Sequence, residues 1–116
     1  MQAVTSQGSA YGRFTGALAT KNLLGAEMAL REMGTASLAS ALDYLVLLAE
    51  LRPERAAAAA IRWHGRFELE ARVMTLAESQ LALAALTSVC AGEPDALEIL
   101  RRLLRRVQPT LVSHIR

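Results

Sequence analysis

Hydrophobic residues recur every three to four positions along most of the chain, in about six segments separated by Gly, Pro, Asn, Ser or Thr. This spacing is the period of an α-helix, and none of the segments alternates between apolar and polar residues as a β-strand does. Short connections between the segments favour antiparallel neighbours. The pattern therefore predicts an all-α protein of about six helices, arranged as three antiparallel hairpins.

We expect the three hairpins to form a compact bundle or an orthogonal array. A short helical-repeat solenoid is the alternative, because the hairpins open at intervals, at Ser9, Ser37 and Thr75, as repeats do. The pattern of Gly16, Ala17, Asn22 and Ala26 in the first hairpin resembles that of a tetratricopeptide hairpin. The other two hairpins do not repeat that pattern, which favours the bundle.

The ends of the first helices are marked by capping residues. Ser9 is the expected N-cap of the first helix, and Asn22 is that of the second, which ends at Gly34. Ser37 opens the third helix. Pro53 ends that helix, because proline disfavours helical backbone in the residue before it, and then begins the fourth helix at its favoured first position.

The third hairpin has the most specific local signal in the chain. Thr75 and Glu78 have the spacing of a capping box, in which hydroxyl and carboxylate each accept a backbone amide of the other residue. Gly92 is expected to end this fifth helix. Pro94 opens the sixth helix and Pro109 stops it.

The same periodicity assigns an inward face to each helix. The third helix is apolar almost all round, so we expect it at the centre of the packing. The predicted inward residues, in chain order, are Tyr11, Phe14, Ala17, Leu18, Leu23, Ala26, Leu30, Met33, Leu38, Ala41, Leu42, Leu45, Leu48, Ala49, Ala56, Ala60, Trp63, Phe67, Leu76, Leu83, Leu86, Cys90, Leu97, Leu100, Leu103, Leu104 and Val107.

Length and composition agree with one helical domain. The chain has 116 residues, of which 53% are hydrophobic, and it is rich in Ala and Leu but poor in Gly and Pro. We divide it into a flexible N-terminal segment (1–8), a single helical domain (9–108) and an apolar-basic C-terminal tail (109–116).

The cysteine content and the length of the apolar runs indicate the cellular compartment of the protein. Cys90 is the single cysteine, so no intrachain disulfide can form, which favours a reducing compartment. The first residues lack the basic start and apolar run of a secretory signal. The longest apolar stretches are about half of the ~20 residues that a spanning helix needs. We therefore expect a cytoplasmic protein without a membrane span.

Several strings resemble those of a known group of sequences. They are Tyr11-Gly-Arg-Phe14, Ala17-Leu-Ala19 before Asn22, Arg62-Trp63 with Arg66, and Thr75-Leu-Ala-Glu78 followed by Gln80-Leu-Ala-Leu-Ala-Ala-Leu86. Over most of Tyr11 to Arg106 the chain resembles a family of short Ala/Leu-rich hypothetical proteins from high-GC Gram-positive bacteria. That family has no assigned activity. The resemblance implies a helical intracellular protein and identifies no functional residue.

Few residues could carry catalysis. The two histidines, His64 and His114, are fifty residues apart, and Cys90 lies in an apolar run where an inert buried thiol is expected. No metal-ligand spacing and no glycine-rich phosphate loop is present. We therefore expect a non-enzymatic protein without metal or cofactor, and keep His64 as acid or base only as a remote option.

Charge is unevenly distributed along the chain. Residues 1–50 carry three basic and four acidic groups, whereas residues 51–116 carry ten and seven. Solvated arginines that complement the dipole of the last helix are the plain explanation. The alternative is a small accessory nucleic-acid-binding protein, since guanidinium groups suit phosphate contacts. Its candidate phosphate-binding residues are Arg62, Arg66, Arg101, Arg102, Arg105 and Arg106.

Apolar side chains are in surplus for so small a domain, so some are expected to contact another chain. A two-fold homodimer is the commonest closed arrangement. The candidate partner surface is Tyr44, Leu47 and Leu51, or the tail. The leading functional hypothesis is a self-associating, helical protein-protein interaction module.

Overall fold

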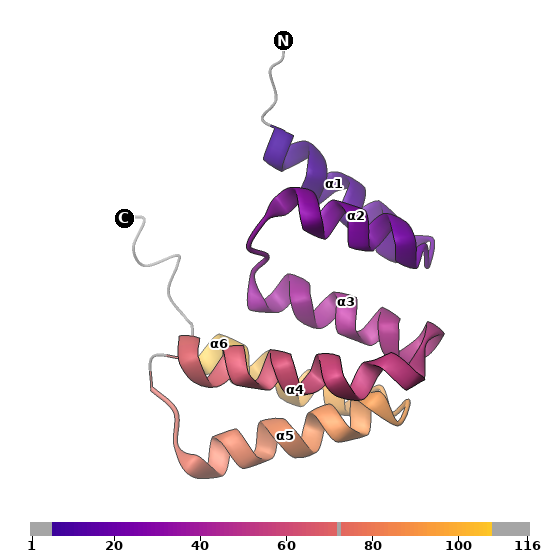
Figure 1. Cartoon of the computed structure of the whole chain (residues 1–116). Coiled ribbons are helices and arrows are strands. Elements are labelled where there is room, and N and C mark those ends of the chain that lie inside the picture. Colours follow the sequence, from indigo (N-terminus) through magenta and orange to yellow (C-terminus); the bar gives the residue numbers. More distant parts are fainter. Residues whose placement is uncertain (1–5, 72, 108–116) are drawn as a thin grey trace.

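The computed structural model describes residues 6–71 and 73–107, and this part of the chain folds into six helices without a strand. The prediction of an all-α protein is confirmed. In chain order (Figure 1) the helices are α1 (Ser6–Ala19), α2 (Leu23–Met33), α3 (Leu38–Leu51), α4 (Pro53–Glu70), α5 (Leu76–Cys90) and α6 (Asp95–Val107).

The helices pair as three antiparallel hairpins, α1–α2, α3–α4 and α5–α6 (Figure 1). The hairpins pack side by side in the order of the sequence and form a bundle. Both outer hairpins pack against α3, and within the described residues they make no close backbone contact with each other. The prediction that α3 is the central helix is therefore confirmed. Contacts between sequential hairpins are a property that this bundle shares with helical repeats.

Most helices begin where the capping residues predict. The Asn22 side chain accepts a hydrogen bond from the amide of Gly25 at 3.0 Å, and Ser37 accepts one from Ser40 at 3.0 Å. Pro53 occupies the first turn of α4. Each bond satisfies an amide that has no partner within its own helix.

The third hairpin begins at the predicted capping box. Thr75 and Glu78 exchange two hydrogen bonds, of 2.9 and 3.1 Å. The first helix differs from the prediction, since it begins at Ser6, three residues before Ser9. The Ser9 hydroxyl is not a cap but accepts a hydrogen bond from Arg13 at 2.8 Å. The predicted stop at Pro109 and the tail 109–116 lie outside the described residues.

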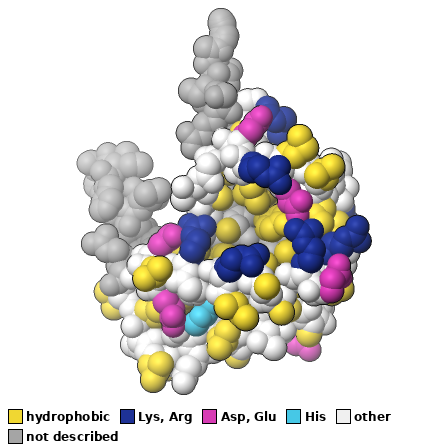
Figure 2. Space-filling model, in the orientation of Figure 1, with side chains coloured by type: hydrophobic (Ala, Val, Ile, Leu, Met, Phe, Trp, Pro, Cys, Tyr) yellow, Lys and Arg dark blue, Asp and Glu magenta, His cyan; other side chains and the backbone are white. Residues whose placement is uncertain are grey.

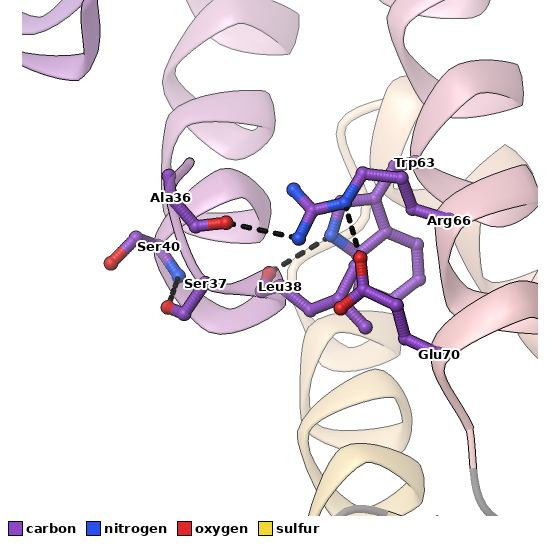
Figure 3. Close-up of polar contacts among 7 residues, drawn as sticks. All are labelled: Ala36, Ser37, Leu38, Ser40, Trp63, Arg66 and Glu70. Atoms are coloured by element: carbon purple, nitrogen blue, oxygen red, sulfur yellow. Dashed lines mark hydrogen bonds and ion pairs between the residues drawn. The ribbon is translucent and has the colours of Figure 1, made fainter. Parts of the chain in front are cut away.

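The core consists of two hydrophobic clusters. The larger one joins α3, α4, α5 and α6, and Trp63 anchors it, because its indole N–H donates to the carbonyl of Leu38 at 2.9 Å (Figure 3). The smaller cluster joins α1 and α2 to α3 through Phe14, Ala17, Ala26, Ala29 and Leu47.

The inward face of α5 was predicted wrongly. Leu76 is 74% exposed and Leu83 is also exposed, whereas Leu86 is buried as predicted. Because α5 is apolar almost all round, periodicity alone does not select its inner side. The prediction for Tyr11 was also wrong, since this side chain is exposed. The buried residues of α5 are Ser79, Ala82, Ala85, Leu86 and Val89.

Within residues 6–71 and 73–107, no helix has both the length and the apolar character that crossing a bilayer requires.

Candidate interaction surfaces

The predicted partner surface at Tyr44, Leu47 and Leu51 is used within the chain. All three side chains pack against the α1–α2 hairpin, and Leu47 is only 5% exposed. These residues are part of the contact between hairpins and do not form an exposed face. Periodicity showed that α3 has no polar side, but not that its own first hairpin covers it.

Tyr44 takes part in a polar contact, centred on Glu27, that joins α2, α3 and α4. Its hydroxyl donates to Glu27 at 2.6 Å, and Arg55 binds the same carboxylate oxygen at 2.9 Å. The hydrogen bond from Tyr44 is the largest cause that lowers the pKa of Glu27, and Arg55 adds to it. Burial, followed by the bond to Glu27, raises the pKa of Tyr44 to about 12. The contact thus pairs the neutral phenol of Tyr44 with the ionised carboxylate of Glu27.

The arginines of α6 are paired with carboxylates. Arg101 binds Asp43 of α3 at 2.7 Å, while Arg102 and Arg105 bind Glu98 at 3.2 and 3.1 Å. Hydrogen bonds from the two arginines lower the pKa of Glu98. Much of the positive charge predicted for this helix is therefore balanced by neighbours on the same chain.

Arg106 binds Glu78, the carboxylate of the capping box, through two nitrogens. This contact ties the end of α6 to the start of α5. The hydrogen bond from Arg106, with the amide of Thr75, lowers the pKa of Glu78 to about 2. The carboxylate thus has a structural role at both helices.

The two candidate arginines of α4 belong to a different part of the surface. Arg66 donates to Glu70 at 2.7 Å and to the carbonyl of Ala36 at 2.9 Å (Figure 3). The second bond attaches the α2–α3 connection to α4. Arg62 is exposed and has no ion pair among the described residues. The six predicted arginines therefore form two sets, one on α4 and one on α6.

His64 takes part in a polar cluster between α4 and α5. Its Nε2 lies 3.0 Å from the carbonyl of Ser79 and 3.2 Å from the hydroxyl of that residue, which donates to Glu68 at 2.5 Å. A serine whose proton is held by a carboxylate is not activated by the imidazole. Ser79 is also buried, so the cluster serves to join two helices. The sequence showed His64 but not these partners, because they depend on the rotation of α5.

Cys90 is half-buried, and burial raises the pKa of its thiol. This agrees with the prediction of an unreactive side chain. In the described part of the chain, no three His, Cys, Asp or Glu residues come together in a way that could hold a metal ion.

Grooves on the described surface include one of about 610 Å³ along α1 and α2. Two smaller ones, of about 260 and 230 Å³, lie beside α3 and share Val46 and Glu50 as lining residues. The 230 Å³ groove is lined by both members of two ion pairs, Lys21 with Glu50 and Arg101 with Asp43.

The outward sides of α4 and α5 carry exposed apolar side chains that sequence reasoning missed. Ile61 and Leu69 of α4 are exposed, as are three leucines of α5. These apolar residues were visible in the sequence, but Leu76 and Leu83 of α5 were assigned to the core. Exposed aliphatic groups at this density are typical of surfaces that contact another chain.

No protein-family model, no curated protein and no solved structure matches the chain.

Proposed function

We propose that this protein is a non-enzymatic helical interaction module that self-associates through the outward side of α5. One observation carries the proposal: no exposed residue of α5 is charged. The centres of protein interfaces are depleted of charge in the same way. The exposed residues are Leu76, Ala77, Gln80, Leu81, Leu83, Ala84 and Thr87.

The spacing of these residues suits contact with another helix. Six of the seven form pairs separated by seven positions, Leu76 with Leu83, Ala77 with Ala84, and Gln80 with Thr87. A repeat of seven keeps the same side chains toward a partner along two turns. The alanines between the leucines allow close approach of the partner backbone.

The position of α5 in the bundle supports the same proposal. Together with α6 it forms the last hairpin, and it lies at the edge of the molecule opposite α1 and α2 (Figure 1). The outer face of a terminal hairpin is ordinarily polar, because nothing covers it. Antiparallel pairing of two α5 helices would place no like charges together and would oppose their dipoles favourably.

The test is the mass of the purified chain by light scattering over a range of concentrations. We expect twice the chain mass of 12.5 kDa at high concentration. Ala84→Glu, which adds charge to the centre of the face without removing buried surface, is expected to give the single chain mass. Ala39→Glu makes the same change at an exposed alanine of α3 and is the matched control. A wild-type protein that stays monomeric, or a dimer unaffected by Ala84→Glu, contradicts the proposal.

The nucleic-acid alternative has less support. Four of its six arginines, those of α6, already bind Asp43, Glu78 or Glu98. Phosphate contacts at those arginines would have to replace these ion pairs. The resemblance to short helical proteins of high-GC Gram-positive bacteria, with a cytoplasmic setting, is compatible with the interaction module.

A further inference from the structure

The outward face of α4 has a continuous apolar stripe that no other part of the described chain covers. Ala58, Ile61, Gly65 and Leu69 follow one another three or four positions apart, so they share one side of the helix. Ile61 is 68% and Leu69 is 87% exposed. The opposite side of α4 holds Trp63 and Phe67 in the core, so α4 has two apolar faces and buries one.

Gly65 lies in the middle of this stripe. A Cβ added there would find no heavy atom within 4 Å, so packing within the chain does not require glycine. Only proline is less favourable inside a helix. Between Ile61 and Leu69, the missing side chain of Gly65 leaves a gap in the stripe. A side chain or the backbone of another helix could approach α4 there.

Charge borders the stripe unequally on its two sides. Arg55, Arg62 and Arg66 lie along the edge nearer α2 and the α2–α3 connection, where Arg55 reaches Glu27 and Arg66 reaches the carbonyl of Ala36. Figure 2 shows the band of Lys and Arg side chains that crosses this face of the molecule over α3 and α4. Arg62 lies between the two anchored arginines in sequence and has no ion pair among the described residues.

We propose that this face of α4 binds an acidic amphipathic helix of a partner protein. The apolar side of that helix covers Ile61 and Leu69 across the gap at Gly65, and a flanking carboxylate pairs with Arg62. The proposal is separate from self-association through α5, because it uses another helix and another set of residues.

Charge also distinguishes this partner from a second copy of the chain. When a helix pairs with itself antiparallel about a two-fold axis, each flank faces the same flank of the copy. The basic edge of α4 would then face another basic edge, and the other edge, with Glu54 and Glu68, would face its own carboxylates. A partner helix that is acidic on the flank facing Arg62 and uncharged on the other flank avoids both repulsions.

A synthetic peptide provides the test. Its length is that of α4, 18 residues, with leucines three and four positions apart, glutamates on one flank and glutamines on the other, and binding to the full chain is followed by fluorescence anisotropy. A twin peptide with lysines in place of glutamates and a DNA duplex are the comparison probes. We expect saturable binding of the acidic peptide alone.

Two variants locate the site. Gly65→Gln fills the gap while favouring the helix, and Arg62→Glu reverses the free charge; each is expected to weaken peptide binding roughly tenfold or more. Gly12→Gln is the matched control, because Gly12 of α1 has equally open surroundings but lies far from the stripe, and it is expected to change nothing. Unchanged circular dichroism shows that each variant folds.

Four outcomes overturn the proposal: no binding of the acidic peptide, equal or tighter binding of the lysine twin, preference for DNA, or affinity unchanged by Gly65→Gln. A fifth, a fall in the mass of the chain caused by Gly65→Gln, would assign this face to a second copy. Loss of dimer formation in Ala84→Glu with peptide binding intact would instead separate this site from the proposed function.

Discussion

The α1–α2 hairpin and the α3–α6 unit differ in how they are built. In α3–α6 the core holds Trp63, Phe67 and eight leucines from four helices. In the described part of α1–α2 the buried residues are one phenylalanine and four alanines, and Leu47 of α3 packs against the hairpin. Small side chains bury little area, so the hairpin gains less from packing than the larger unit does.

Besides the apolar contacts around Leu47, polar contacts at exposed and half-buried positions join the two regions. Lys21 binds Glu50 at 2.6 Å, and Glu27 binds both Tyr44 and Arg55. Exposed ion pairs contribute little to stability. From this difference we expect the hairpin to be the part of the bundle that opens first, while the surfaces proposed for partners lie on the α3–α6 unit.

Truncating a phenylalanine in each region is the strongest test of this difference. Phe67 and Phe14 are both buried, at 0% and 1% exposure. Phe67→Ala is expected to lower the free energy of unfolding by about 4 kcal/mol, because it leaves a cavity in the main core. Phe14→Ala is expected to detach α1–α2 and leave α3–α6 folded. Trp63, the only tryptophan, reports the larger unit, and circular dichroism reports all helices.

In Phe14→Ala, the two signals are therefore expected to separate during urea unfolding, with the fluorescence transition close to that of the wild type. If both signals shift together and by as much as in Phe67→Ala, the chain unfolds as one unit and the comparison fails.

The fold was largely predictable because its determinants are local. Asn22, Ser37, Pro53 and Thr75 each set a helix start through a bond or a steric restriction that involves only nearby residues. The start of α1 was not predictable in the same way. Ser9 is a suitable capping residue, yet the helix extends back to Ser6 and the Ser9 hydroxyl accepts from Arg13 instead.

The surfaces were less predictable because they depend on rotation and on neighbours. Apolar residues lie on almost every side of α5, so periodicity does not fix its rotation. In the structure the buried side is the one from which Ser79 contacts α4, next to Glu78, which binds Arg106. Charge counts likewise could not show that Arg101 lies opposite Asp43, 58 positions away. The sequence predicted which residues are available and not which of them pair.

Tyr44→Phe is a milder way to weaken the junction of the two regions. It removes the hydrogen bond to Glu27 while keeping the ring in place. We expect a loss of about 1.5 kcal/mol, the lower end for a bond to a charged group, because the site is only half-buried. The loss should appear in amide exchange of α2 before that of α5. Equal effects in both helices would show that this bond does not act at the junction.

Gly12→Ala strengthens the weaker region. Gly12 is exposed inside α1, and a Cβ there meets no atom within 4 Å. We expect a gain of about 0.7 kcal/mol from helix propensity, seen as slower amide exchange in α1. Gly34→Ala is the opposing control, because the φ of 78° at Gly34 strains any other residue and should destabilise the end of α2. A stabilisation that spreads equally to α5 would argue against independent opening.

Mild acid is expected to act most weakly, and at the same junction. The pKa of Glu27 is lowered in the folded chain by Tyr44, so the stability that its ionised form contributes is complete above its ordinary value of 4.5 and is lost as the pH falls through the lowered value. Because the pKa of Glu78 is about 2, this carboxylate stays ionised to lower pH and keeps its contact between α5 and α6. Between pH 4.5 and a pH of about 2, amide exchange should accelerate in α1 and α2 while Trp63 fluorescence stays unchanged. Glu27→Gln should remove most of this acid response, whereas Glu78→Gln should leave it in place; the reverse result would move the acid-sensitive contact to the third hairpin.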